Sequence, residues 1–377
     1  MDLGFTQEQE MLRRTARELL ERECPTQLVR AMETDEKGYS PELWQKMAGL
    51  GWMGLSFPEQ YGGSGGSFTD LVTLLEEMGR ALVPGPFLPT VVLGGLTLFL
   101  AGSEEQKRRL LPQIAAGKAL LTVALTEPDG RYEPGSITVR ATPEKDGYVI
   151  NGTKFFVLDA HVADHLMVVA RTREGKDPAE GISLFLVDAH TPGIHLTPLQ
   201  TMALDKQFEV TFENILVPKE NLLGNLDHGG PVVERMLERA AVAKCAEIIG
   251  MAQKALELTV EYAKIRVQFG RPIGSFQALQ HLCADMLVNL DSSKLLTYQA
   301  AWKISEGLPA TKEASMAKAW ASEACRQITQ DAHQIHGGIA FMVEHDLQLY
   351  FRRVKAAESL FGSPEFHHEL ICREMGL

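Results

Sequence analysis

The sequence predicts a mixed α+β fold, with helical segments at both ends of the chain and a β-domain between them. Apolar residues recur at helical spacing up to about residue 118 and again from about residue 226. Between these segments, short runs rich in Val, Ile, Phe and Thr are separated by Gly, Pro, Asp and Asn, which is typical of strands and turns. We therefore expect an N-terminal helical domain over 1–118, an antiparallel β-barrel or sandwich over 119–225 and a C-terminal four-helix bundle over 226–377.

Composition places the chain among ordinary globular proteins. Its 377 residues, 45% hydrophobic and 23% charged, are enough for a large core and for two or three domains. The net charge of −12, without a basic stripe, argues against a nucleic-acid binder. No apolar run has the length of a membrane span, and the first residues lack the basic and apolar parts of a secretory signal. Five widely spaced cysteines without a CxxC pair favour reduced thiols, so we expect a cytoplasmic protein.

The N-terminal helices have recognisable starts. Thr6 suits an N-cap, and Gln9 completes a capping box for the helix that follows. Ser40 is a second N-cap, with Pro41 at the first helical position and a stop near Gly51. The apolar stretch "VVLGGLTLFLAG" at 91–102 fits a buried helix.

The β-domain and the C-terminal helices are predicted from equally local signals. Within the β-domain, "KDGY" at 145–148 suits the tight turn of a hairpin. After about residue 228, helical spacing continues without a break to residue 265, which predicts one helix about 50 Å long. Three further helical patterns cover 275–306, 311–336 and 344–373.

The stretch "RVQFGRPIGSFQ" at 266–277 interrupts these helices. Gly270 and Pro272 break helical structure, yet Arg266, Gln268 and Phe269 place a fixed charge, an amide and an aromatic face at the corner. An anionic diphosphate attached to a planar ring system would use all three groups. The alternative is an ordinary corner between helices with a surface arginine.

Three other stretches carry residues suited to a bound ligand. "QIHGGIAF" at 334–341 puts Gln334 at a helix end beside Gly337 and Gly338, where backbone can approach a ligand closely. "ALTEP" at 124–128 ends a strand with a hydroxyl, a carboxylate and a proline, and "NGTKFF" at 151–156 ends in two aromatic residues. The sequence has no P-loop, no GxSxG motif and no zinc-type spacing, and His333 with His336 favours a polar helix face, so we predict no metal.

Taken in order, five stretches resemble the acyl-CoA dehydrogenase flavoprotein family: "YGGSGG", "ALTEP", "NGTKFF", "RVQFGRPIGSFQ" and "QIHGGIAF…EHDLQLYFRR". The resemblance implies FAD as cofactor and α,β-dehydrogenation of an acyl-CoA thioester. It also implies a homodimer or homotetramer, or a hetero-oligomer with a related chain, and an electron-transferring flavoprotein as electron acceptor.

The resemblance also implies which residues bind FAD. Arg266, Phe269 and Gln277 would face the FAD of a neighbouring subunit, with Arg266 at its diphosphate. The residues implied at the adenosine of that FAD are Gln334, Gly337 and Gly338. The residues implied at the isoalloxazine of the subunit's own FAD are Leu125, Thr126 and Phe156.

The catalytic base is the main departure from the family. The family usually places this glutamate in a Tyr-Glu-Gly-Thr stretch, which lines up with residues 360–363, so Phe361 takes the base position and Ser363, an implied cofactor contact, follows. Some members instead carry the glutamate before an arginine at the start of the long helix. Glu238 precedes Arg239 there, but counting back from Gly250 puts the family position two residues later, about 200° around the helix.

Glu238 is nevertheless the first candidate base, with a solvated glutamate at the start of the helix as its alternative role. Glu247 is a second candidate, with a structural ion pair as its alternative role. Two further family residues are replaced: Tyr132 falls where a serine usually contacts the flavin phosphate, and the Trp-Ile-Thr stretch reads as residues 156–158, Phe-Val-Leu.

Three functions remain open at this point. The chain is an FAD-dependent acyl-CoA dehydrogenase with a relocated base, or a non-catalytic subunit that completes a partner's FAD site, or a flavin-free helical scaffold.

Overall fold

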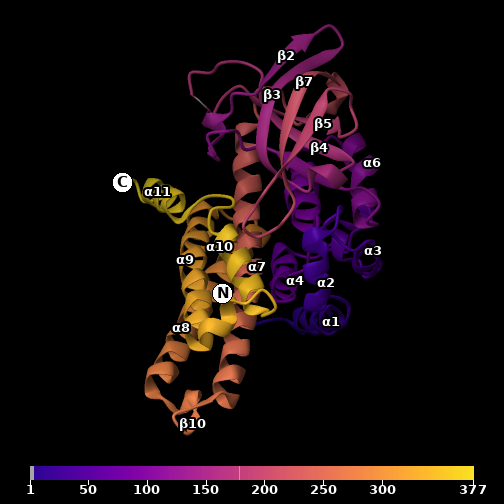
Figure 1. Ribbon diagram of the computed structural model, residues 1–377. Helices are drawn as coiled ribbons and strands as arrows, with labels where there is room; N and C mark the ends of the chain where they lie inside the picture. The colour runs from indigo at the N-terminus through magenta and orange to yellow at the C-terminus, as the bar shows by residue number, and fades with distance from the viewer. Residues whose placement is uncertain (1–3, 178) are drawn as a thin grey trace. The chain divides into compact units, whose positions relative to one another are not determined.

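The computed structural model describes residues 4–177 and 179–377, which pack as two units that do not follow chain order (Figure 1). The helical unit comprises the residues up to Ala31, together with Phe68–Val83 and Ala241–Leu377. The sheet unit comprises Met32–Ser67 and Pro84–Ala240. The N-terminal helices are thus shared between the two units, a division that local sequence patterns do not reveal. The domain boundaries at 118 and 225 stay a prediction.

The N-terminal helices begin where the capping residues predict. Thr6 accepts a hydrogen bond from the backbone N–H of Gln9, whose side chain accepts from the N–H of Thr6 in return. Ser40 caps the helix that starts at Pro41. The helices of this region are α1 (Gln7–Glu23), α2 (Thr26–Thr34), α3 (Pro41–Gly49), α4 (Phe68–Arg80), the π-helix η3 (Leu88–Gly95), α5 (Leu96–Ala101) and α6 (Glu104–Ala115).

The sheet unit is built on one eight-stranded sheet in the order β6-β7-β3-β2-β4-β5-β8, with β1 paired to β4. Most pairs are antiparallel, as expected, but β4 runs parallel to both β1 and β2. The strands are β1 (Leu121–Ala124), β2 (Arg140–Glu144), β3 (Gly147–Leu158), β4 (His165–Arg171), β5 (Ile182–Asp188), β6 (Ile194–Leu199), β7 (Gln207–Pro218) and β8 (Leu222–Leu223).

The predicted hairpin at "KDGY" is confirmed. Glu144 of β2 pairs with Gly147 of β3, so Lys145 and Asp146 form a two-residue turn. One face of the sheet is apolar throughout: Val168, Phe185 and Phe212 are wholly or almost wholly buried there with their neighbours on adjacent strands. Burial of this face sets the register, because a slip by one residue would turn every such side chain toward solvent.

The C-terminal helices confirm the long-helix prediction and correct one boundary. The helix α7 (Gly230–Ile265) has 36 residues, or about 54 Å. It is followed by the strands β9 (Val267–Gln268) and β10 (Arg271–Pro272), then by α8 (Gln277–Ser305) and α9 (Thr311–His336). The pattern at 344–373 is not one helix but two, α10 (Leu347–Ala357) and α11 (Pro364–Glu374). The break falls at Phe361 and Gly362, whose φ angles of 62° and 109° lie outside the helical range.

In the helical unit, α9 packs against α8, α10 and α11, while α4 packs against α1 and α8 (Figure 1). Glycines bring α4 and α7 unusually close together. A methyl group added at Gly79 would lie 2.1 Å from the carbonyl oxygen of Glu247, and one added at Gly250 would lie 1.9 Å from that of Glu76. No side chain fits in either place, so the two backbones touch there.

All five cysteines are free and all lie in the helical unit: Cys24, Cys245, Cys283, Cys325 and Cys372. Burial raises the pKa of Cys24 to about 11 and that of Cys245 and Cys325 to about 12. Cys372 is exposed. No helix in the described part of the chain is long and apolar enough to cross a membrane.

Candidate functional site

The sheet unit brings the "ALTEP" and "NGTKFF" stretches together. The backbone N–H of Phe155 donates to the carbonyl oxygen of Thr126 at 2.8 Å, so the end of β1 lies beside the middle of β3. Leu125 and Thr126 are buried, whereas Phe156 is 45% exposed. These three predicted flavin residues therefore share one small region, with Phe156 turned outward.

A β-bulge explains the direction of Phe156. The register of β3 against β7 shifts between Lys154 and Val157, and Phe156 takes a φ of 55°. An extra residue in one strand bends it and reorients a side chain. Because phenylalanine rarely adopts a positive φ, the surrounding strand must hold it there. The bulge presents an aromatic face near the end of β3, which suits stacking on a flat ring.

A buried ion pair fixes the same region from inside. Lys154 Nζ donates to Glu127 Oε1 at 2.8 Å and to the carbonyl oxygen of Leu125 at 2.9 Å. The Glu127 carboxylate also accepts from the backbone N–H groups of Thr138 and Val139 and from the Thr138 hydroxyl. It thus ties the end of β1 to the segment that leads into β2.

The protonation of this pair follows from its surroundings. Burial alone would raise the pKa of Glu127, but Lys154 and the donated hydrogen bonds hold the pKa below its usual value. Burial lowers the pKa of Lys154 to about 8 although Glu127 opposes the shift. Both groups are therefore ionised at neutral pH. The sequence pointed to the carboxylate of "ALTEP", which is Glu127, but not to its pairing with Lys154.

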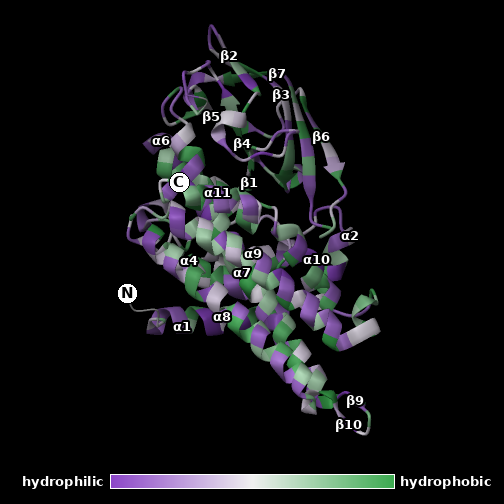
Figure 2. Cartoon of the chain, turned by 90° about the vertical axis from the view of Figure 1, so that its left-hand side faces the viewer, coloured by the Kyte–Doolittle hydropathy of each residue, from purple (hydrophilic) through white to green (hydrophobic). Residues whose placement is uncertain are grey.

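In the helical unit, the predicted corner is a tight hairpin of β9 and β10 that projects beyond the ends of α7 and α8 (Figure 2). Phe269 and Gly270 form its turn with φ angles of 54° and 77°. Phe269 is 92% exposed, and Arg266 is exposed at the end of α7. The Arg271 guanidinium lies 4.1 Å from the ring centre of Phe276. The hairpin thus presents aromatic and cationic groups to solvent.

The end of α9 reaches the end of α7 through a stacked pair. The rings of Tyr262 and His336 are 4.3 Å apart and nearly parallel. This contact connects the turn of α7 that precedes Arg266 with the last turn of α9, where Gln334 is exposed. Gly337 follows with a φ of 67°, and a methyl group added at Gly337 or Gly338 would meet nothing within 4 Å.

These residues fit an anionic dinucleotide such as FAD. Among the described residues, no carboxylate lies within ion-pair distance of Arg266, so its charge remains available for a diphosphate. The two glycines leave open space in which a ligand can approach the backbone. The helical unit holds Arg266, Phe269, Gln277, Gln334, Gly337, Gly338 and Ser363, and the sheet unit holds Leu125, Thr126 and Phe156.

The position that the resemblance gives to the base has no acid–base group. Phe361 is 6% exposed with a φ of 62°. The hydroxyl of Ser363 accepts from the backbone N–H of Phe366 at 3.3 Å and so serves as the N-cap of α11. A phenyl ring cannot take up a proton, so a base must come from elsewhere.

The two glutamates of α7 differ in their surroundings. Glu247 forms an ion pair of 2.5 Å with Lys244, and both side chains are largely buried. This contact favours the structural ion-pair role for Glu247. Glu238 is half-buried, whereas Ala240 and Ala241, two and three residues later, are completely closed to solvent. Glu238 therefore lies away from the most buried face of the helix.

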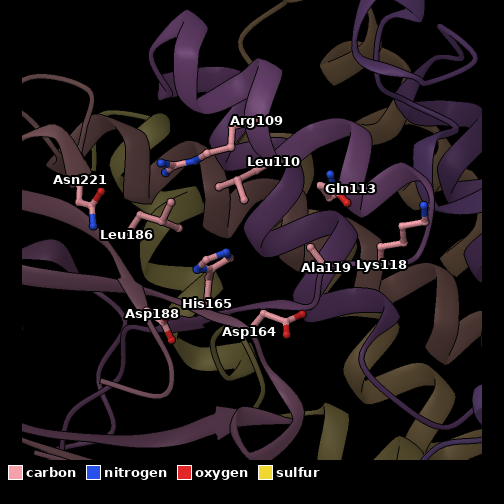
Figure 3. A pocket seen from close by; sticks show the side chains of 10 residues that line it. All are labelled: Arg109, Leu110, Gln113, Lys118, Ala119, Asp164, His165, Leu186, Asp188 and Asn221. Carbon is pink, nitrogen blue, oxygen red and sulfur yellow. The ribbon is translucent and has the colours of Figure 1, made fainter. Parts of the chain in front are cut away.

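A cavity of about 540 Å³ lies between α6 and the sheet, within the sheet unit (Figure 3). His165 stands at its centre, with Arg109 and Lys118 on the helix side. Asp164 accepts from the backbone N–H of Leu120 at 2.7 Å and so is used locally. The cavity contains none of the residues predicted to bind FAD.

The described residues contain no group of three or more His, Cys, Asp or Glu side chains suited to a metal ion. His333 and His336 instead hydrogen-bond through Nδ1 with the carbonyl oxygens of Thr329 and Ala332, each at 2.8 Å.

Comparison with known proteins identifies three successive matches. Models of the acyl-CoA dehydrogenase N-terminal, middle and C-terminal domains match residues 6–118, 122–215 and 227–376. Among curated proteins, a probable acyl-CoA dehydrogenase of Bacillus subtilis, YngJ, is 35% identical and covers 100% of both chains. The CarC subunit of a caffeyl-CoA reductase–Etf complex from Acetobacterium woodii is 37% identical over 97% of this chain and 98% of its own. Acryloyl-CoA reductase (NADH) from Anaerotignum propionicum is 34% identical over 100% of this chain and 96% of its own.

Solved structures give the same picture. Butyryl-CoA dehydrogenase from Megasphaera elsdenii superposes with a TM-score of 0.93, 30% identity and full coverage of both chains. The ChsE4–ChsE5 complex from Mycobacterium tuberculosis gives 0.91 at 29% identity, covering 100% of this chain and 99% of the other. The FAD complex of PigA gives 0.91 at 28% identity with full coverage of both.

Proposed function

The chain belongs to the acyl-CoA dehydrogenase family, and we propose on that premise that its base is not where the family usually keeps it. As a member, the chain is an FAD-dependent oxidoreductase that acts on the CH–CH bond next to an acyl-CoA thioester. When bound, FAD supplies the two-electron acceptor for this reaction. The residues of the chain must bind the cofactor, polarise the thioester and provide for removal of the α-proton.

We propose that the two sets of predicted residues bind FAD in the roles given by the resemblance. Arg266, with no carboxylate partner among the described residues, would neutralise a diphosphate. The bulge that turns Phe156 outward supports a stacking role beside Leu125 and Thr126. The open space above Gly337 and Gly338 supports close approach of an adenosine.

The buried Phe361 is the observation that shapes the rest of the proposal. General base catalysis typically contributes about 10²- to 10⁴-fold, or roughly 3–5 kcal/mol of barrier. An unactivated carbon acid needs a base more than most substrates, since water removes such a proton poorly. A chain with phenylalanine at the base position would be close to inactive unless a carboxylate from elsewhere served as the base.

Glu238 is our first candidate for that carboxylate. It stands immediately before Arg239 near the start of α7, as in family members with the alternative arrangement, and it is half-buried rather than fully solvated. Its displacement by about 200° from the expected face is the point against it. Glu247 is less suitable because Lys244 already occupies its carboxylate.

The second candidate is a partner chain that supplies the glutamate. The features that stand out most on the surface are those expected to reach a neighbouring subunit, above all the hairpin with Phe269. Structural neighbours include the ChsE4–ChsE5 complex and Tcur3481–Tcur3483, each of which is named for two different chains. In this arrangement the chain would complete the FAD site of its partner.

The direction of the reaction and the electron acceptor form part of the same proposal. Several relatives are named as reductases, and CarC is named as the subunit of a complex with Etf. We therefore propose that both oxidation of acyl-CoA and reduction of enoyl-CoA be tested, with an electron-transferring flavoprotein as partner. The free thiols support a cytoplasmic location.

The test starts with the chain expressed alone. Flavin absorbance in the purified protein, bleached on addition of butyryl-CoA or longer acyl-CoA thioesters, would support a self-sufficient enzyme. Glu238→Gln should then slow the bleaching about 10²-fold or more, whereas Glu234→Gln, an exposed glutamate one turn earlier, should not. Bleaching unchanged in Glu238→Gln would exclude Glu238. Flavin or activity that appears only on co-expression with a related chain would favour the partner.

A further inference from the structure

The turn between α10 and α11 is held by hydrogen bonds from a buried lysine of α9. Lys318 of α9 is 0% exposed, and its Nζ donates to the carbonyl oxygen of Gly362 at 3.0 Å. The same ammonium donates to the carbonyl oxygens of Ala357 and Glu358 at 3.2 and 2.9 Å, and to Ser322 Oγ at 3.0 Å. It therefore satisfies the last carbonyls of α10, where the partial negative charge of the helix favours a cation.

A buried histidine holds the preceding residue of the turn. His367 of α11 is 4% exposed, and its Nε2 lies 3.0 Å from the carbonyl oxygen of Phe361. A carbonyl only accepts, so Nε2 carries the proton and donates it. Nδ1 is buried without a hydrogen-bond partner among the described residues, which fits the neutral tautomer.

Two basic groups thus fix two successive peptide carbonyls. We propose that Lys318 and His367 are positioning residues for the acyl-CoA reaction: together they hold the Phe361–Gly362 turn, the position at which the family places its base, in a single left-handed conformation. Its catalytic consequence rests on the proposed function. We call the hydrogen bonds of Lys318 and His367 to this turn the clamp. The clamp itself does not rest on the proposed function, because it consists of hydrogen bonds within the helical unit.

The turn needs such a clamp because its backbone conformation is unfavourable without supporting contacts. Phe361 has a φ of 62°, a conformation that non-glycine residues seldom adopt without support. Gly362 has a φ of 109°, and a methyl group there would lie 2.5 Å from Phe366 Cδ1 and 2.7 Å from His367 Nε2. The turn is therefore packed against the very side chain that binds its carbonyl.

The charges around the clamp allow one cation, not two. Lys318 is faced by Lys244 and Cys245 from α7, by Glu358 at the end of α10 and by His367 from α11. Burial lowers the pKa of Lys318 to about 8, so it keeps its charge at neutral pH. Burial, with a contribution from Lys318, lowers the pKa of His367 to about 4, so the imidazole stays neutral.

Loss of the Lys318 proton should release the turn. The ammonium shares three N–H donors among four oxygen atoms. A neutral amine has two N–H donors, and its lone pair can accept only from the Ser322 hydroxyl, so three carbonyl oxygens are left to share two donors. Above about pH 8 the carbonyl of Gly362 therefore competes for fewer donors, and the Gly362–Ser363 peptide loses its anchor, while His367 still binds the carbonyl of Phe361.

Hydrogen exchange of the full-length flavoprotein tests the clamp directly. We would follow peptides that cover residues 358–366 and express each rate relative to the intrinsic rate at that pH. Lys318→Met should exchange at least about tenfold faster in this segment at pH 7. Lys355→Met is the matched control, because the partly exposed Lys355 pairs with the side chain of Glu358, at 2.6 Å, rather than with its carbonyl oxygen. The wild type should lose protection between pH 7 and 9, and Lys318→Met should show no such change.

A second pair of variants keeps the test decisive if Lys318→Met does not fold. His367→Gln retains an N–H donor for the Phe361 carbonyl, and His367→Leu does not. Faster exchange in the Leu variant and restored protection in the Gln variant support the clamp. Equal protection in both variants overturns it, as does exchange in Lys318→Met that matches Lys355→Met. A uniform loss of protection over α9 and α11 would also overturn it, because it would indicate a general scaffold role.

The catalytic consequence has its own measurement. In the flavoprotein, alone or with its partner chain, His367→Leu should lower the rate of flavin reduction by butyryl-CoA about 10²-fold, and His367→Gln should recover most of it. A loosened turn with unchanged reduction rates would refute the positioning role. If the wild type shows no reduction under any condition, the proposed function fails, while the exchange results still decide the clamp.

Discussion

Glu127 and Lys154 form an ion pair of 2.8 Å in which the lysine side chain is 0% exposed and the glutamate 4%. The pair joins the end of β1 to β3 and to the segment before β2, directly behind Leu125 and Thr126. The conformation of the backbone that is expected to face a flavin ring thus depends on one buried ion pair.

Removal of either partner should be costly. Lys154→Met leaves a buried carboxylate without its cation, and we expect a loss of about 3–5 kcal/mol in the free energy of unfolding, measured with urea. Glu127→Gln combined with Lys154→Met should recover part of this loss. As a matched surface pair, Arg140→Met, which breaks the exposed contact with Glu174, should cost at most about 1 kcal/mol. A similar cost for both variants would mean that the buried pair is not a strong contact.

Stability should depend on pH through His367. Its pKa falls from 6.5 in the unfolded chain to about 4 in the folded protein. Between these values the unfolded chain binds the additional proton, so stability is full above pH 6.5 and decreases as the pH falls toward 4. The loss from this residue is on the order of 3 kcal/mol. Thermal unfolding of His367→Gln should depend less on pH in this window than the wild type, while the exposed His368→Gln should follow the wild type.

The glycine contact between α4 and α7 should not tolerate a side chain. Gly79→Ala and Gly250→Ala force the two backbones apart, and we expect each to lower the free energy of unfolding by about 1–3 kcal/mol or more. Gly49→Ala in α3 is the control, because nothing lies within 4 Å of the added methyl group. It should be neutral or stabilising by up to about 1 kcal/mol. Equal melting temperatures for all three variants would contradict the close contact.

The hairpin of β9 and β10 should matter for association. Phe269→Ser removes a ring that is 92% exposed and, in the proposed function, faces the FAD of another subunit. We expect a smaller assembly in light scattering and at least about tenfold weaker retention of flavin on dilution. Leu216→Ser, an exposed apolar residue of the sheet unit, is the comparison and should change neither quantity. A Phe269 variant that assembles and keeps its flavin normally would separate the hairpin from the cofactor site.

Sequence reasoning succeeded where local chemistry decides the structure. The caps at Thr6 and Ser40, the hairpin at Lys145–Asp146 and the full length of α7 each follow from residues close together in the chain. The helical pattern at 344–373 shows the limit. Its periodicity continues through Phe361, although Gly362, the N-cap Ser363 and Pro364 are local signals of a break. The buried groups of α9 and α11 then hold the turn between the two helices.

The same limit applies to the candidate site. Motif order was enough to indicate the family, and in the structure Thr126 lies beside Phe155. The FAD contacts themselves stay a prediction. The Glu127–Lys154 and Lys318 contacts were missed because they join residues that are far apart in the chain or bind backbone carbonyls, which no side-chain pattern reveals. The departure at Phe361 was visible in the sequence alone.

The distribution of thiols allows unfolding of the helical unit to be followed by alkylation of the native protein. Every cysteine belongs to the helical unit, and Cys372 alone is exposed, so an alkylating reagent should first modify a single site per chain. Cys283 is half-buried and should react next. Modification of the three buried thiols would then report an opening among the helices, whereas unfolding of the sheet alone would not change the number of labels.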